Sequence, residues 1–150
     1  MSEKHFRQVT NIMPPMPCLW SVGTYMERFY QDLGEKKFTG VKCPKCKTVY
    51  VPPRKYCSCS RAPLNQFVAV KSSGVIVNYT VAYQKVDGSR RESPVIIGLI
   101  RLDGADTAVF GEVRAAGTAI GIGTRVKAVF ADQPGNTVES VSHFEPAKKK

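Results

Sequence analysis

The chain has 150 residues, 43% of them apolar, and a formal net charge of +10 at pH 7. This length and composition suit one full hydrophobic core with a small satellite module, and they argue against a disordered chain. The sequence shows neither the continuous apolar run of a membrane span nor the apolar region of a signal peptide. We therefore expect a cytoplasmic protein with no membrane partner.

Residues 1–40 are predicted to form an arm followed by a helix. The arm is polar and then proline-rich, which favours extended backbone. A helix is expected over residues 21–33, because apolar side chains recur there at three- and four-residue steps. Thr24 and Glu27 have the spacing of an N-terminal capping box, and Gly34 suits the C-terminal end.

The expected helix carries an aromatic stripe. Such a stripe is ordinarily part of a core, but a ribbon of about twenty residues offers little apolar surface to cover it. We therefore predict that part of the stripe binds a partner protein. The candidate partner-binding residues are Trp20, Tyr25, Phe29 and Tyr30.

Four of the five cysteines fall within residues 41–62, as Cys43-Pro-Lys-Cys46 and Cys57-Ser-Cys59. Two such pairs joined by a hairpin can place four thiolates around one zinc ion, so we predict a rubredoxin-like zinc ribbon with a structural metal. The second pair has one intervening residue, whereas the usual turn has two. The alternative is a site that has lost its metal, in which Cys57 and Cys59 are small buried or reactive thiols. A reducing compartment favours metal over disulfides.

The ribbon is also the basic end of the chain. Residues 1–62 carry eleven basic and four acidic side chains, whereas residues 63–150 carry eleven and eight. This distribution favours a polyanionic partner such as nucleic acid or a phosphate-rich cofactor. The other interpretation is that these charges keep the protein soluble and offset an anionic metal centre.

After the ribbon, residues 63–146 are predicted to form a five-stranded oligonucleotide/oligosaccharide-binding (OB) barrel, and residues 147–150 a basic tail. Short strands separated by turns, without long helices between them, indicate a small antiparallel β domain. The fold class is thus mainly β with an N-terminal helix. The expected strands cover residues 67–71, 75–84, 95–102, 106–114, 125–131 and 137–144.

In the strand over residues 75–84, apolar and polar side chains alternate. The period of two predicts one buried face, which would include two tyrosines. The residues expected on that face are Val75, Val77, Tyr79, Val81 and Tyr83.

No catalytic constellation is legible in the sequence. His5 and His143 are the two histidines, and neither belongs to a nucleophile, metalloprotease or phosphate-loop motif. We expect no catalytic residue in this chain and a zinc ion that is structural.

The order of these motifs resembles the zinc-ribbon/OB-fold acyl-CoA-associated family. The resemblance covers residues 20–146, and its most specific parts are the CPKC motif, Pro52-Pro53-Arg54 and the strand entry from Gly74 to Thr80. It implies a noncatalytic subunit that stands beside a thiolase-fold enzyme in a hetero-oligomer. Archaeal relatives bridge acetoacetyl-CoA thiolase and hydroxymethylglutaryl-CoA synthase, and bacterial relatives accompany thiolases, acyltransferases or aldolases.

Such a subunit would help to bind or channel coenzyme A or an acyl-CoA, while the catalytic residues lie in the partner chain. Basic side chains bind phosphate groups. The Pro52-Pro53 pair stiffens the backbone directly before two basic residues of the ribbon, Arg54 and Lys55, so these lose less freedom on binding. The candidate CoA-binding residues are Lys45, Lys47, Arg54 and Lys55.

The main alternative is a single-stranded nucleic-acid-binding zinc-ribbon/OB protein. Such a protein needs exposed aromatic side chains on its barrel strands, where bases can stack. The expected burial of Tyr79 and Tyr83 argues against it. A free-standing enzyme is a third interpretation, and it lacks a candidate nucleophile and base.

Overall fold

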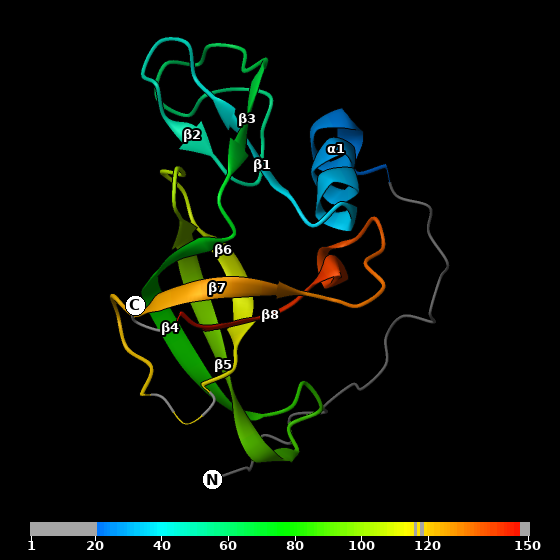
Figure 1. The fold of residues 1–150 in the computed structure, drawn as a ribbon, viewed down its shortest axis with the longest axis vertical. Coiled ribbons are helices and arrows are strands. Elements are labelled where there is room, and N and C mark those ends of the chain that lie inside the picture. Colours follow the sequence, from blue (N-terminus) through cyan, green and yellow to red (C-terminus); the bar gives the residue numbers. More distant parts are fainter. Residues whose placement is uncertain (1–20, 116, 118, 148–150) are drawn as a thin grey trace, which may run out of the picture.

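A computed structural model describes residues 21–115, 117 and 119–147. One helix precedes a small three-stranded sheet, which is followed by a closed barrel (Figure 1). The mainly β fold class is therefore confirmed. The elements are α1 (Gly23–Gly34), β1 (Phe38–Lys42), β2 (Val49–Tyr50), β3 (Gln66–Val70), β4 (Ser73–Gln84), β5 (Arg90–Leu102), β6 (Val109–Val113), β7 (Arg125–Phe130), the 3-10 turn η1 (Val138–Ser140) and β8 (Val141–Pro146).

The ribbon sheet has the strand order β2-β1-β3, with both pairs antiparallel. From sequence, residues 67–71 were expected to belong to the barrel part of the chain. In the structure β3 instead pairs with β1 along its whole length, from Phe38 opposite Val70 to Lys42 opposite Gln66. The chain enters the barrel only at β4, so the ribbon sheet takes its third strand from beyond the cysteine-containing loops.

The barrel closes in the order β4-β5-β6-β8-β7, which confirms the five-stranded OB fold. Antiparallel pairs join most neighbours, whereas β6 and β8 are parallel at Val113 and Phe144. Pairing of β4 with β7, from Ser73 to Val75, completes the closure. The residues expected as one last strand over 137–144 divide into η1 and β8.

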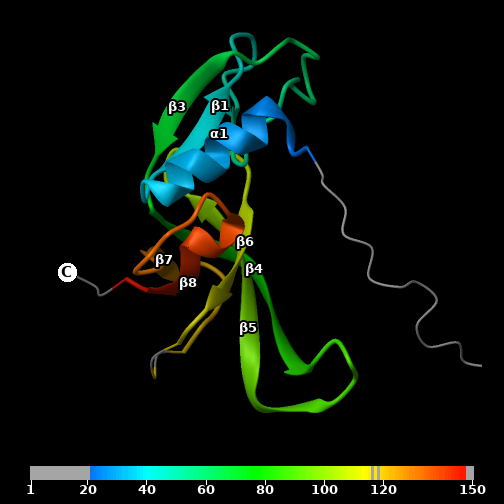
Figure 2. The ribbon, with the colours of Figure 1, turned by 90° about the vertical axis from the view of Figure 1, so that its right-hand side faces the viewer.

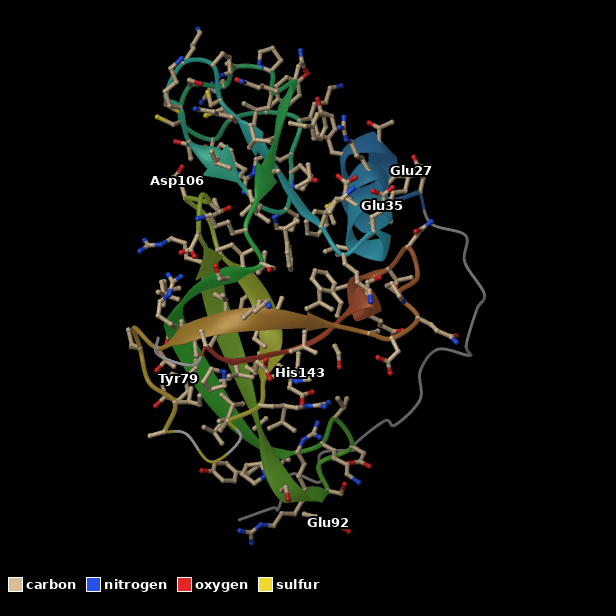
Figure 3. The ribbon with its side chains drawn as sticks, in the orientation of Figure 1. Glu27, Glu35, Tyr79, Glu92, Asp106 and His143 are labelled. Atoms are coloured by element: carbon tan, nitrogen blue, oxygen red, sulfur yellow. The ribbon has the colours of Figure 1, made fainter. Side chains whose placement is uncertain are left out.

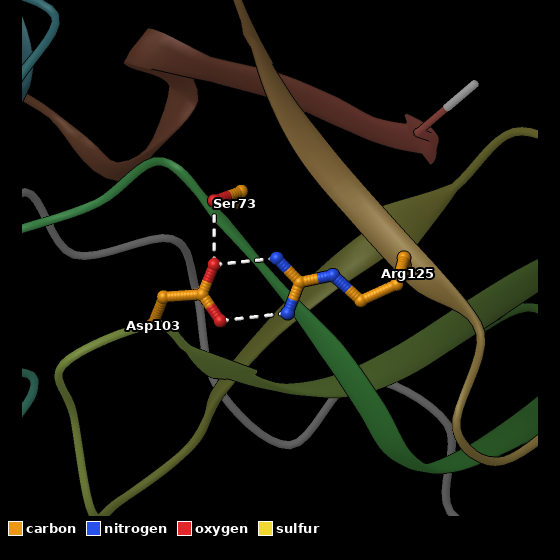
Figure 4. A network of polar contacts seen from close by, with 3 residues as sticks. All are labelled: Ser73, Asp103 and Arg125. Carbon is orange, nitrogen blue, oxygen red and sulfur yellow. Dashed lines mark hydrogen bonds and ion pairs between the residues drawn. The ribbon is translucent and has the colours of Figure 1, made fainter. Parts of the chain in front are cut away.

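One carboxylate links the strand ends at this closure (Figure 4). Both Arg125 terminal nitrogens donate to Asp103, at 2.7 and 2.6 Å, and the Ser73 hydroxyl donates to the same carboxylate at 2.6 Å. Ser73 is the first residue of β4 and Arg125 the first of β7. The contact therefore lies where β4 meets both of its barrel neighbours.

The ribbon sheet and the barrel share one hydrophobic core. The turn after β5 reaches the ribbon, where the Val49 amide donates to the Asp106 carboxylate at 2.7 Å, and the Asp106 amide donates to the Val49 carbonyl at 2.9 Å. The label of Asp106 in Figure 3 marks this junction. The core members come from α1 (Phe29, Leu33), the ribbon (Phe38, Val49, Val51, Val70) and the barrel (Ile76, Ile100, Leu102, Val113, Val126, Ala128, Phe144).

Helix α1 lies beside the junction of ribbon and barrel, as the two views in Figures 1 and 2 show. The expected capping box is wrong: Val22 is the N-cap residue and makes no side-chain capping hydrogen bond. Gly34 is still helical, and its absent side chain leaves room for Asn136, whose Oδ1 would lie 2.7 Å from an added Cβ. The helix end is thus fitted to the loop before η1.

The predicted burial of the β4 tyrosines is wrong. Tyr79 is 38% exposed and Tyr83 is 59% exposed, whereas Gly74 and Ile76 are the buried residues of this strand. A bulge at Val77 interrupts the alternation, because Ile76 lies opposite Ile100 but Asn78 lies opposite Leu99. Beyond the bulge, β4 and β5 extend past the barrel as a projecting hairpin (Figure 2).

No helix in the described part of the chain is long and apolar enough to cross a membrane.

Candidate functional site

Three cysteine sulfurs meet in the ribbon. The Sγ atoms of Cys43, Cys46 and Cys57 all lie within 4.8 Å of one another. Cys43 and Cys46 belong to the turn between β1 and β2, and Cys57 to the loop between β2 and β3. Three soft thiolate donors converging from two turns fit a tetrahedral zinc site, so these residues can hold the ion that a zinc ribbon requires.

Local hydrogen bonds favour ionised sulfur at Cys57 and Cys43, whereas the pKa of Cys46 is raised. The Ser60 hydroxyl and amide, followed by the Tyr50 hydroxyl, lower the pKa of Cys57 to about 5. The Ser60 amide donates to the Cys57 Sγ at 3.4 Å, and the Tyr50 hydroxyl lies 3.2 Å from the same atom. Ser60 is also the main cause of the lowered pKa of Cys43. Adjacent thiolates repel each other, and a bound cation removes that repulsion.

Cys59, which was expected to be the fourth ligand, does not join the cluster and is exposed. The hydroxyl of Ser60 lies beside the three sulfurs instead, 3.2 Å from the Sγ of Cys43. Sequence reasoning missed Ser60. A signal was present, because Cys57-Ser-Cys-Ser60 repeats the two-residue spacing of Cys43-Pro-Lys-Cys46.

The structure places the four candidate CoA-binding residues on exposed loops of the ribbon. Lys45 and Lys47 lie in the first cysteine turn, and the Lys47 ammonium donates to the Pro44 carbonyl at 2.7 Å. The guanidinium of Arg54 lies 4.5 Å from the centre of the Tyr50 ring and donates to the Ser58 hydroxyl at 3.2 Å.

Lys55 follows Arg54 in the second loop, and its ammonium is 5.5 Å from the centre of the Tyr56 ring. Aromatic rings attract such cations without removing them from water. The Arg54 and Lys55 side chains are therefore partly ordered yet remain open to an anion.

The aromatic side chains of α1 have different environments. Trp20 lies outside the described residues. Phe29 is only 4% exposed, because α1 packs on the shared core and not on the ribbon alone, so little of its ring is open to a partner. The Tyr25 hydroxyl donates to the Leu64 carbonyl at 2.8 Å, so this half-buried residue anchors the helix to the ribbon. Tyr30 is half-buried as well.

Tyr30 lines an open cavity of about 570 Å³ between α1, β6 and the η1–β8 segment. Its walls are mainly apolar, and Phe110, on β6, is 77% exposed. Large apolar side chains rarely stay in water together unless a partner or ligand covers them. The lining residues are Met26, Phe29, Tyr30, Leu33, Phe38, Pro52, Ala108, Val109, Phe110, Gly111, Glu112, Val138, Glu139, Val141, His143 and Phe144.

Sequence reasoning missed this apolar groove. The residues that line it come from segments far apart in the chain. The one signal in the sequence was Phe110, an aromatic residue at an outward-facing position in the alternation of β6. His143, labelled in Figure 3, also lines the groove. The Nδ1 of His143 lies 3.1 Å from the hydroxyl of Ser142. Within the described residues, His143 forms no ion pair with a carboxylate.

Comparisons with known proteins agree with this architecture. Residues 31–64 match the family model of the ChsH2 rubredoxin-like zinc ribbon domain, and residues 67–131 match that of the ChsH2 C-terminal OB-fold domain. The chain is similar to a DUF35 domain-containing scaffold protein of Methanocaldococcus jannaschii, with 28% identity over 92 residues. That match covers 61% of this chain and 65% of the scaffold protein.

Two solved structures share the fold. A DUF35 family protein of unknown function from Sulfolobus solfataricus has a TM-score of 0.67 and 22% identity, over 83% of this chain and 87% of that one. A chain of the Ltp2-ChsH2(DUF35) aldolase has a TM-score of 0.58 and 21% identity, over 79% of this chain and 91% of that one. With its ribbon and its barrel both matched, this chain belongs to the family of ChsH2-type zinc-ribbon and OB-fold proteins.

Proposed function

We propose that this chain is a noncatalytic accessory subunit of a thiolase-type complex that acts on CoA thioesters. Two relatives support an accessory role, since one is named a scaffold protein and another belongs to the structure named the Ltp2-ChsH2(DUF35) aldolase. In this proposal the partner chain supplies the residues that cleave or transfer the acyl group. The present chain binds the partner and completes the path of coenzyme A.

The observation that carries the proposal is the apolar groove beside α1. Its volume of about 570 Å³ and its rim residue Phe110 form a concave apolar surface on the side of the molecule that α1 and η1 flank. Aromatic side chains at the centre of an interface contribute much of its affinity, because they bury a large area with few rotatable bonds. A protruding segment of a thiolase-fold enzyme would fill this groove and cover Phe110.

The basic ribbon loops supply the second half of the proposal. Arg54 and Lys55 already rest against aromatic rings, so they lose less freedom when they meet an anion. Lys45 and Lys47 add positive charge from the neighbouring turn. We propose that these four side chains receive the phosphate groups of coenzyme A, with an affinity that falls as ionic strength rises.

Co-purification with a thiolase-fold enzyme from the same organism tests the partner. We expect co-elution of the two chains in size-exclusion chromatography, and a loss of about thirtyfold in affinity on Phe110→Ser, because an interface anchor contributes about 2 kcal/mol. Ile122→Ser is the matched control, since Ile122 is 70% exposed and does not line the groove. A wild-type chain that never co-elutes, or two variants that behave alike, would contradict the proposal.

Steady-state kinetics of the assembled complex test the CoA contact. Arg54→Ala should raise KM for a CoA thioester at low salt and leave kcat little changed, because a ground-state phosphate contact is removed. Arg101→Ala is the control, since Arg101 is an exposed arginine on the barrel. An unchanged KM for Arg54→Ala would assign the basic loops another role.

One observation favours a second candidate function, the binding of single-stranded nucleic acid. Tyr79 and Tyr83 are exposed on β4, and bases stack on such side chains. Figure 3 shows Tyr79 on the barrel, away from the basic ribbon, so the aromatic and basic features do not form one continuous track. Salt-dependent binding of a fluorescent oligonucleotide, together with no co-elution with the thiolase, would favour this alternative.

A further inference from the structure

The two turns that carry the cysteine cluster have the same backbone pattern. In the first, the Cys43 amide donates to the Thr48 carbonyl at 2.9 Å. In the second, the Cys57 amide donates to the Ala62 carbonyl at 3.0 Å. Each bond spans the same number of residues, so Cys57 is the structural counterpart of Cys43 and Ala62 is that of Thr48.

The middle of each turn repeats as well. The Lys47 amide donates to the Cys43 carbonyl at 3.1 Å, and the Arg61 amide donates to the Cys57 carbonyl at 3.0 Å. Lys47 and Arg61 both adopt the left-handed backbone conformation, with φ of 63° and 52°. Non-glycine residues seldom take this conformation, so its recurrence at matched positions identifies the two turns as copies of one shape.

Matching the two turns residue by residue through these hydrogen bonds aligns Ser60 with Cys46, the second ligand of the first turn. The side-chain contacts agree with this placement: the Ser60 Oγ lies 3.2 Å from the Cys43 Sγ, and the Cys46 Sγ lies 3.4 Å from the Cys57 Sγ. Cys59 occupies the preceding position, is exposed, and does not belong to the group of converging sulfurs.

We propose that Ser60 takes the fourth position around the zinc ion and that Cys59 remains a free thiol on the surface of the metal-loaded ribbon. The donor set is then three thiolates and one serine oxygen. With a neutral hydroxyl, such a centre carries one negative charge less than four thiolates would give. The proposal holds whether or not the chain binds a thiolase-fold enzyme.

Cobalt substitution tests the ligand set of the whole chain, because the intensity of the sulfur-to-cobalt absorption reports the number of bound thiolates. Cys59→Ser should leave the intensity unchanged, whereas Ser60→Cys should raise it by about one third, from three thiolates to four. Cys46→Ser is the positive control and should lower it. A fall for Cys59→Ser as large as that for Cys46→Ser would overturn the proposal, because Cys59 would then be a ligand.

Thiol counting gives a readout that does not depend on absorption intensity. Cys18, the fifth cysteine of the chain, is first replaced by serine. The zinc-loaded protein should then present one rapidly modified thiol, which Cys59→Ser removes. Adding a chelator should then expose the three others. Protection of all four ribbon thiols until the chelator is added would contradict a free Cys59.

Discussion

The Asp103 carboxylate accepts hydrogen bonds from the first residues of two strands, Ser73 of β4 and Arg125 of β7. Arg125, and then the Ser73 hydroxyl, lower the pKa of Asp103 from 3.8 to about 2. Both hydrogen-bond donors favour the charged form. Since β4 lies between β5 and β7 in the barrel, the ionised Asp103 carboxylate stabilises the pairing of β4 with β7 that closes the barrel.

Asp103→Asn should lower the free energy of unfolding by about 1 kcal/mol at neutral pH, the scale of a well-oriented surface ion pair. The folded-state pKa lies below the ordinary value of 3.8, so the stabilisation is complete above that pH and is lost as the pH falls toward about 2. Urea unfolding across this pH range measures the difference. Asp132→Asn removes an exposed charge elsewhere as the control, and a difference that persists at pH 2 would refute the assignment.

At the same scale, the ribbon shows what residue spacing predicts and what it does not. The pairing of CPKC with a second cysteine group predicted the converging set of Cys43, Cys46 and Cys57, because short turns project such side chains to one point. The repeat of the CPKC spacing in Cys57-Ser-Cys-Ser60 pointed to position 60, but spacing alone does not decide whether the side chain of Cys59 or that of Ser60 faces the cluster. The orientations of these two side chains depend on the backbone hydrogen bonds of the second turn, in particular on the left-handed residue Arg61 that closes it.

At the scale of elements, the sequence predicted the strand that the structure shows as β4, but it predicted the wrong buried face. At the start of β4 the buried residues are Gly74 and Ile76, which lie on the face opposite to the predicted one, and the bulge at Val77 then shifts the register between Ile76 and Asn78. The far half of the hairpin also leaves the barrel, so Tyr83 is exposed whichever way it points. A single sequence contains no marker of either event. For α1, the helical periodicity could be read from the sequence, but the core shared by ribbon and barrel that buries Phe29 could not.

At the scale of the molecule, a hydroxyl contact holds the ribbon to the barrel beside the contact of Val49 with Asp106. The Val51 amide donates to the Thr107 Oγ1 at 2.7 Å, and the same hydroxyl donates to the Val51 carbonyl at 2.9 Å. Val51 is buried in the shared core. The side chain of Thr107 therefore satisfies two backbone groups that have little access to water.

Thr107→Val should lower the free energy of unfolding by about 2 kcal/mol, because it keeps the shape of the side chain but leaves two buried polar groups without partners. Denaturant titration of the zinc-loaded protein provides the measurement. Thr80→Val, on the exposed part of β4, is the control and should stay within about 0.5 kcal/mol of the wild type. Equal stability of the two variants would show that the ribbon does not depend on this contact.

The pairing of β3 with β1 has a consequence for how such proteins can be recombined. The ribbon match ends at residue 64 and the barrel match begins at residue 67, which invites an exchange of parts at that point. An exchange there would pair β1 with a β3 from the other parent, so the packing around Phe38 and Val41, both buried in the present sheet, would no longer be matched. A crossover that keeps the ribbon sheet whole therefore has to fall after Val70, the last residue of β3.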